Sequence, residues 1–128
     1  MVDFGVEPEL LVVADGAAWE AWLEANHAGS DGVRLAVPKQ RSGAVGPSLV
    51  EAIDVALCFG WIDSRIGRIV ERYTGVVFTP RRARSSWSAR NRAIALRLIA
   101  EGRMRPAGLL EVERAQADGR WPAEESTD

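Results

Sequence analysis

The sequence contains one cysteine, one histidine and one lysine. A single cysteine, Cys58, cannot form an internal disulfide, which is typical of a reducing compartment. There is no CxxC motif and no second histidine, so a zinc site would have to be rich in carboxylates. We therefore expect no metal and no cofactor. A catalytic pair of Cys58 with His27 is also disfavoured, because Cys58 lies near the C-terminal end of its expected helix, where the helix dipole opposes a thiolate.

Long apolar runs and nucleotide-binding loops are missing as well. The run Ala56–Phe59 is far shorter than the roughly 20 residues needed to cross a bilayer, so no membrane insertion is expected. Residues 1–9 carry three acids and no cation, which argues against a secretory signal and favours a cytoplasmic location. The glycine-rich loop at 39–47 has neither the GxxxxGK[ST] nor the GxGxxG order of a phosphate-binding loop.

The composition is that of one soluble domain. The chain has 128 residues, of which 47% are hydrophobic and 27% are charged, and domains most often contain about 100–150 residues. No internal repeat and no long linker divides it. We expect a single domain over residues 1–121, beginning with a loosely held arm at 1–10, and a disordered polar tail at 122–128.

Hydrophobic periodicity and capping residues predict the order of the helices and strands. The expected elements are a short edge strand within 10–13, a helix from Asp15 to about His27, a strand at 33–37, a helix from Ser48 to Gly60, a hairpin of strands 61–70 and 73–79, a helix capped by Ser86 or Ser88 and ending near Glu101, and a helix from Pro106 to Gly119. Hairpins imply antiparallel pairing. The predicted fold class is therefore α+β: a small antiparallel sheet, made of the hairpin plus one or two further strands, packed against about four helices.

Charge is distributed unevenly along the chain. Residues 60–105 hold eleven arginines against three acids, a local balance of +8, whereas the remaining residues carry −10. Lys39 is the only basic residue of the chain that is not an arginine, and arginine pairs bidentately with carboxylate or phosphate. For most of these arginines we expect neutralisation by acids of the flanking helices. For the TPRR segment at 79–82 we expect an anion-binding role.

The segment from Thr79 to Asn91 is the candidate functional site. Its arginines precede a helix N-terminus, whose free amides attract anions, and its serines add hydroxyl donors. A structural role is the alternative, in which the helix is capped by serine and the arginines pair with nearby carboxylates, for example Asp63 with Arg81 or Arg82. The candidate ligand-binding residues are Asp63, Arg81, Arg82, Ser85, Trp87, Ser88 and Asn91.

Two other functions remain open. Glu51, Asp54 and Asp63 are candidates for acid and base in a hydrolase-type enzyme near Cys58. The arginine-rich region 60–105 is a candidate for nucleic-acid binding, although the acidic pI of about 5.5 and the lack of a known nucleic-acid motif count against it.

Several motifs together resemble a known family. ALCFGWIDS, FTPRR, SSWSARN and EGRMRPAGLLEVERAQADGRW occur in this order and are similar to those of the YdeI/OmpD-associated family, also called bacteriocin-protection proteins. The similarity extends from about Trp19 to Trp121. One departure is VRLAVPK, where such proteins more often carry an aromatic residue near Leu35 or Ala36.

The resemblance implies a small bacterial cytosolic domain, linked in some members to tolerance of antimicrobial peptides or envelope stress. It implies no catalytic residue, cofactor or substrate. The first expectation is therefore a non-enzymatic domain that binds an anionic small molecule or an acidic protein partner at the Arg81 segment. No catalytic residue is assigned.

Overall fold

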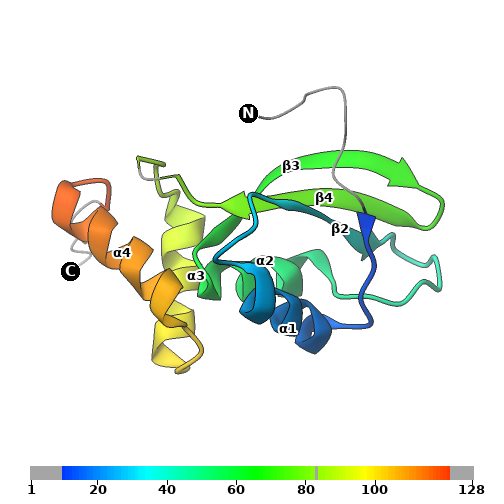
Figure 1. The fold of residues 1–128 in the computed structure, drawn as a ribbon, viewed down its shortest axis with the longest axis horizontal. Helices are drawn as coiled ribbons and strands as arrows, with labels where there is room; N and C mark the ends of the chain where they lie inside the picture. Colours follow the sequence, from blue (N-terminus) through cyan, green and yellow to red (C-terminus); the bar gives the residue numbers. More distant parts are fainter. Residues whose placement is uncertain (1–9, 83, 122–128) are drawn as a thin grey trace.

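The helices and strands of the domain follow the predicted order (Figure 1). The computed structural model describes residues 10–82 and 84–121. The predicted tail at 122–128 and residues 1–9 of the predicted arm lie outside this part of the chain. The elements are β1 (Leu10–Leu11), α1 (Gly16–Asn26), β2 (Val33–Pro38), α2 (Leu49–Cys58), β3 (Trp61–Val70), β4 (Tyr73–Pro80), α3 (Ala89–Ala100) and α4 (Pro106–Asp118).

The four strands form one mixed sheet in the order β1-β2-β4-β3. The hairpin of β3 and β4 is antiparallel, as predicted, and β2 extends it by pairing with β4. The sheet is not wholly antiparallel, however, because β1 pairs with β2 in parallel, with Leu10 opposite Arg34. This pair is joined through α1, and a crossover of this kind returns the chain in the same direction. The α+β class is confirmed, with one parallel pair added.

The predicted helix starts are confirmed by their capping bonds. The side chains of Asp15, Ser48 and Ser88 accept hydrogen bonds from the backbone amide three residues later, at 2.9, 3.1 and 3.0 Å. Ser88, and not Ser86, therefore caps α3. Each cap satisfies one of the amides that the first helical turn leaves without a partner.

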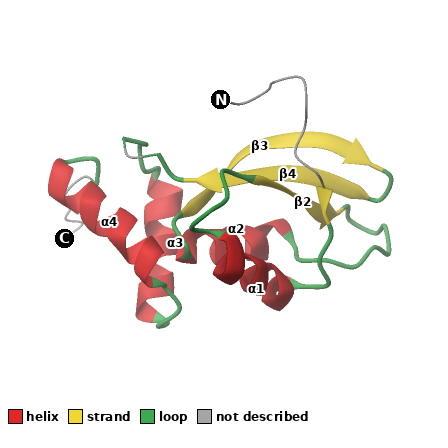
Figure 2. Cartoon of the chain, in the orientation of Figure 1, coloured by secondary structure: helices red, strands yellow, loops and turns green. Residues whose placement is uncertain are grey.

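The main core lies between the sheet and helices α1 and α2, which cover one of its faces (Figure 2). Trp19, Leu35 and Phe78 are fully buried, and the Trp19 and Phe78 rings lie 5.2 Å apart. Helix α2 buries all of its residues from Ala52 to Cys58 except Asp54. Helix α2 therefore contributes most of its length to the core.

Helices α3 and α4 pack at one end of this core. The first turn of α4 contacts the last turn of α2, because the Arg105 amide donates to the Cys58 carbonyl at 3.0 Å. Gly108 makes this approach possible. A Cβ atom there would lie 2.7 Å from the Leu57 carbonyl oxygen and closer still to that of Cys58. The α2–α4 contact therefore requires a residue without a side chain at position 108.

We expect Gly108→Ala to lower the free energy of unfolding by about 1–3 kcal/mol, because two backbone carbonyls would have to move to admit the methyl group. Urea unfolding at neutral pH measures the loss. Gly29→Ala is the matched control, since a Cβ at Gly29 meets no atom within 4 Å. Equal stabilities of the two variants would contradict the close α2–α4 contact.

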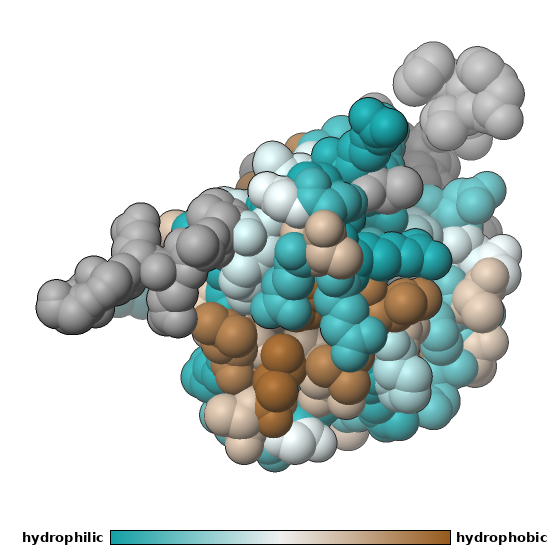
Figure 3. Space-filling model, turned by 90° about the vertical axis from the view of Figure 1, so that its left-hand side faces the viewer, coloured by the Kyte–Doolittle hydropathy of each residue, from teal (hydrophilic) through white to brown (hydrophobic). Residues whose placement is uncertain are grey.

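The end of the molecule formed by α3 and α4 carries an apolar surface. Each helix buries one side, for example Ala95 and Leu98 in α3. Leu96 and Ile99 of α3 and Leu110 of α4 are nevertheless 37–48% exposed. Figure 3 shows apolar side chains gathered on this end beside polar ones.

Within the described ranges, no helix is long and apolar enough to cross a membrane.

Ion pairs neutralise part of the basic middle of the chain. Arg97 contacts Asp54 of α2 at 2.8 Å. Arg105 contacts Glu20 and Glu24 of α1, at 3.1 and 2.9 Å. These contacts confirm, for two of the arginines, that acids of neighbouring helices balance their charge.

Candidate functional site

Arg81 is fixed at the point where β4 ends. Pro80 is the last residue of the strand, and the Arg81 amide donates to the Gly60 carbonyl at 2.9 Å. Gly60 has a φ of +79°, and a Cβ there would lie 3.1 Å from the Ala107 carbonyl oxygen and from Cγ of Glu111. Gly60 therefore brings the start of the β4–α3 loop close to helix α4.

The Arg81 side chain is 94% buried, with 6% of its surface exposed. Its Nη1 donates to Ser85 Oγ at 2.9 Å and to the Ser86 carbonyl at 3.1 Å. Its guanidinium carbon lies 3.7 Å from the centroid of the Trp87 ring, in a cation–π contact. One end and one face of the guanidinium therefore hold the β4–α3 loop in place.

The other edge of the Arg81 guanidinium is unpartnered. Its Nε and Nη2 atoms are buried and have no hydrogen-bond partner among the described residues. Together these two N–H groups form the side-on fork of arginine, whose geometry matches the two oxygens of a carboxylate or phosphate. A buried N–H group without a partner costs about 1–3 kcal/mol. A hydrogen-bond acceptor placed at this edge would remove that cost.

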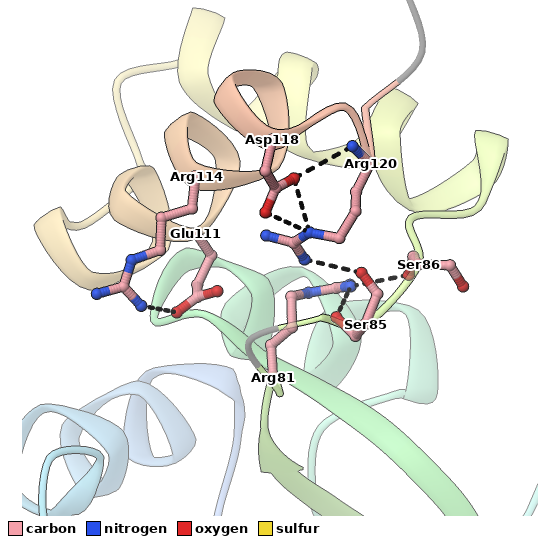
Figure 4. A network of polar contacts seen from close by, with 7 residues as sticks. All are labelled: Arg81, Ser85, Ser86, Glu111, Arg114, Asp118 and Arg120. Atoms are coloured by element: carbon pink, nitrogen blue, oxygen red, sulfur yellow. Dashed lines mark hydrogen bonds and ion pairs between the residues drawn. The ribbon is translucent and has the colours of Figure 1, made fainter.

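Helix α4 supplies a second guanidinium to the same place. Gly119, with φ +88°, ends the helix and is followed by Arg120. The Arg120 Nε donates to both Asp118 carboxylate oxygens at 2.8–2.9 Å, and its Nη1 donates to the Ser85 carbonyl at 2.8 Å. Its Nη2 is buried without a partner in the described part of the chain. Arg81 and Arg120 are thus both anchored on Ser85 (Figure 4).

Glu111 and Trp87 complete the arrangement. One Glu111 oxygen contacts Arg114 at 3.5 Å, whereas the other, Oε1, is buried and lacks a partner within 10–82 and 84–121. The same holds for the Trp87 indole Nε1. In Figure 4, Arg81, Glu111 and Arg120 come together between the β4–α3 loop and α4. We call this group the Arg81 cluster: Arg81, Ser85, Trp87, Glu111, Asp118 and Arg120.

Burial and neighbouring charges shift the ionisation of Arg81. Burial lowers the pKa of the Arg81 guanidinium to about 10, the Glu111 carboxylate opposes this shift, the charge of Arg120 adds to it, and Asp63 opposes it. Arg81 remains a cation at neutral pH. The cluster therefore holds a buried positive charge next to a second guanidinium. A bound anion would offset the free-energy cost of burying the charge and the repulsion between the two cations.

An open pocket of about 440 Å³ adjoins the cluster. Arg84, Asp118 and Arg120 line it. Arg120 therefore borders the open pocket and also contacts the loop that carries Arg81. Two guanidinium groups and one carboxylate give this pocket a net positive charge.

The structure brings together three of the seven predicted site residues, namely Arg81, Ser85 and Trp87. Ser88 instead caps α3 by accepting from the Asn91 amide, so neither residue joins the cluster through a bond among the described residues. Arg82 is exposed. The Asn91 amide at the α3 N-terminus is thus bonded to the Ser88 cap, whereas Arg81 carries buried side-chain donors that have no partner among the described residues.

Asp63 lies half-buried on β3, opposite Phe78 of β4. The predicted ion pair of Asp63 with Arg81 or Arg82 is not formed within the described residues. Its charge still acts on Arg81 from a longer distance. Asp63 therefore contributes to the potential at the site without contacting it.

Glu111, Asp118 and Arg120 were missed by the sequence analysis. Glu111 and Asp118 are seven residues apart on α4 and resemble ordinary exposed charges of an amphipathic helix. The bond from Arg120 to Ser85 spans 35 residues. The sequence did offer one signal, Gly119. A glycine at the end of a helix adopts the left-handed backbone conformation, which turns the chain, and with it Arg120, back toward the helix.

The carboxylates considered for acid–base chemistry lie elsewhere. Asp54 is paired with Arg97. Glu51 is exposed, and its carboxylate lies over Gly16 at the start of α1. Cys58 borders a separate pocket of about 420 Å³, together with Glu20, Arg103 and Arg105 among others. Burial raises the pKa of its thiol from 9.0 to about 11, so the thiol is neutral at physiological pH.

Metal ligands do not gather in the described ranges 10–82 and 84–121, where no group of three or more His, Cys, Asp or Glu residues could hold an ion. The chemistry that these ranges offer at the Arg81 cluster is that of N–H donors, one carboxylate oxygen and an indole ring.

The fold and the site define a small α+β domain with a buried arginine, Arg81, and a half-buried one, Arg120, beside the end of strand β4. The chain belongs to the DUF8412 family, a domain of unknown function, which matches residues 11–111. No curated protein and no solved structure matches the chain. The family segment includes Arg81, Ser85 and Trp87 and ends at Glu111, so Asp118 and Arg120 lie beyond it.

Proposed function

We propose that this domain binds the anionic group of a small molecule, or of an acidic partner, at the Arg81 cluster. The observation that carries the proposal is the buried Nε–Nη2 edge of Arg81, which has no partner among the described residues. Three further polar atoms of the cluster share this property: Trp87 Nε1, Arg120 Nη2 and Glu111 Oε1.

The alternative, that Arg81 only holds the loop, accounts for its Nη1 and not for its other edge. The bonds from Nη1 to Ser85 and Ser86 would hold the loop without Nε and Nη2. A purely structural cation in this position would gain most from a contact with Glu111. No ion pair joins the two side chains within the described residues, although the Glu111 carboxylate acts on Arg81 electrostatically. An anion between them and Arg120 satisfies the free edge.

Entry of a ligand involves Arg120. The free edge of Arg81 is sealed from solvent, and Arg120 lies between the open pocket and Ser85 by virtue of its contacts with both. An anion in the pocket competes with Asp118 and with the Ser85 carbonyl for the Arg120 guanidinium. Exchange of these partners opens a path to Arg81.

We expect Arg81→Met to weaken anion binding about 10- to 100-fold, since it removes a charge-assisted bidentate contact worth roughly 1.5–3 kcal/mol. Isothermal titration with short-chain carboxylates and with inorganic phosphate measures the affinity. Arg81→Lys keeps the charge and loses the fork, so it is expected to bind nearly as weakly as the methionine variant.

Arg82→Met is the matched control, because Arg82 is the adjacent arginine and is exposed. It changes the net charge equally and is expected to bind like the wild type. If Arg81→Met melts at the wild-type temperature and binds the same anions with unchanged affinity, the proposed site is wrong. If Arg82→Met weakens binding as much, the effect is one of net charge.

The hydrolase and nucleic-acid alternatives gain no specific support. Asp54 is neutralised by Arg97, and the neutral Cys58 thiol is a poor nucleophile. The resemblance to the YdeI/OmpD-associated family and the role in antimicrobial tolerance stay predictions. They are compatible with a domain that acts by binding.

A further inference from the structure

The unpartnered atoms of the Arg81 cluster specify more than negative charge. Four are N–H donors: Arg81 Nε and Nη2, Trp87 Nε1 and Arg120 Nη2. The fifth, Glu111 Oε1, is an acceptor. A ligand that only accepts hydrogen bonds leaves the buried Glu111 oxygen without a partner, and such an atom costs free energy in proportion to its burial. The complementary ligand therefore accepts at one end and donates at the other.

The charge of the site limits the ligand further. Arg81, Arg114 and Arg120 face Glu111 and Asp118, so these five residues carry a formal charge of +1. A monoanion neutralises the group, and a zwitterion with one carboxylate and one ammonium group leaves its net charge unchanged. A phosphate dianion leaves an excess negative charge beside two carboxylates in a partly buried place, where charges are weakly screened.

The shape of the free edge points in the same direction. The side-on fork of arginine is planar and matches the plane of a carboxylate. The Arg81 guanidinium carbon already lies 3.7 Å from the centroid of the Trp87 ring, which covers one face of the group. Among the neighbouring charges, that of Glu111 acts most strongly on Arg81, so a carboxylate bound to this fork lies near the unpartnered acceptor of the cluster.

From these three properties we infer that the ligand is a small monocarboxylate carrying a hydrogen-bond donor on the carbon next to the carboxylate, a 2-hydroxy or 2-amino acid. The carboxylate accepts from Arg81 Nε and Nη2, and the hydroxyl or ammonium group donates to Glu111 Oε1. This assignment rests on the proposed anion-binding function and adds the class of ligand.

The test compares three ligands of one size: propionate, lactate and alanine. Titration calorimetry of the full chain is expected to show lactate or alanine binding about tenfold more tightly than propionate, because each adds one hydrogen bond to a charged acceptor. Inorganic phosphate is expected to bind more weakly than lactate. Preference for alanine over lactate assigns the amino acids, and the reverse preference assigns the hydroxy acids.

The variant Glu111→Leu separates this inference from the proposed function. It is expected to abolish the preference for lactate or alanine over propionate while propionate still binds in an Arg81-dependent way. Equal binding of all three ligands to the wild type, or tightest binding of phosphate, overturns the ligand class and leaves the anion site standing. If no anion binds and Arg81→Met and Glu111→Leu lose equal stability, the two side chains serve only each other, and the proposed function fails as well.

Discussion

Replacing Trp19 with alanine is expected to lower the free energy of unfolding by about 3–5 kcal/mol, a large part of the roughly 5–15 kcal/mol that holds a domain folded. Trp19 is fully buried between α1 and the sheet, 5.2 Å from Phe78 and 5.7 Å from Trp22. Its indole Nε1 also donates to the Ala52 carbonyl of α2 at 3.0 Å. The variant therefore loses apolar contacts and the bond that joins two helices. Urea unfolding followed by far-UV circular dichroism measures the change.

Two further variants divide this effect into its parts. Trp19→Phe keeps an aromatic ring and removes the bond to Ala52, so a loss of about 1–2 kcal/mol is expected from the hydrogen bond and the smaller ring. Trp22→Ala removes a stacked tryptophan that is only half-buried, and a smaller loss than that of Trp19→Ala is expected. A Trp19→Ala loss below that of Trp22→Ala would show that the core is not centred on Trp19.

The predictions that succeeded depend on neighbouring residues. Asp15, Ser48 and Ser88 cap their helices because a side-chain oxygen reaches an amide only three residues away. The hairpin follows from two β-rich runs around Glu71 and Arg72, and Glu71 adopts the left-handed backbone, φ +48°, that the tight turn requires. Such features need no knowledge of the rest of the chain.

The direction of β1 was beyond sequence reasoning. Leu10 and Leu11 form a strand of only two residues, and their side chains would suit either direction. What decides the direction is that α1 packs across one face of the sheet and carries the chain back before β2 begins. The parallel pair is thus a consequence of helix packing, which the local pattern does not contain.

The candidate site shows the same limit. Arg81, Ser85 and Trp87 lie within seven residues, so the sequence placed them together and the structure confirms this. Glu111 and Arg120 reach them only because Gly60 and Gly108 allow α4 to approach the sheet edge and the end of α2. Sequence reasoning also placed the anion at the α3 N-terminus, where the structure shows the alternative that it left open: the Ser88 hydroxyl accepts from the Asn91 amide.

Arg81 has one structural role and one proposed binding role, which mutations can separate. Its Nη1 stabilises the loop through Ser85 and Ser86, whereas its Nε and Nη2 add a cost in the absence of a ligand. Ser85→Ala is expected to weaken the hold of Arg81 on the loop and to leave its Nε–Nη2 edge unchanged. Sites that bind charged ligands commonly hold such unpaired groups, because a pairing made within the protein would have to be broken on binding.

Wild-type stability is expected to fall by about 2–3 kcal/mol more than that of Cys58→Ala as the pH rises from about 9 to 11. Burial raises the pKa of the Cys58 thiol from 9.0 to about 11, while the charges of Arg103 and Arg105 lower it and those of Glu20 and Asp54 raise it. In this window the unfolded chain releases the thiol proton and the folded chain keeps it, so rising pH favours unfolding. Each pKa unit corresponds to about 1.4 kcal/mol.

The measurement is a series of urea titrations of both proteins between pH 7 and 11, with the difference between them plotted against pH. The difference cancels other groups that titrate in both chains, including Arg81, whose lowered pKa of about 10 makes an opposite contribution as the pH rises above about 10. Cys58→Ala starts from a lower stability at pH 7, because loss of the sulfur leaves a small cavity in the core, and it lacks the alkaline loss. A constant difference across the series would mean that Cys58 ionises as readily in the folded chain as in the unfolded one. Its thiol would then be accessible from the pocket of Arg103 and Arg105, and alkylation by iodoacetamide at pH 8 would proceed without unfolding.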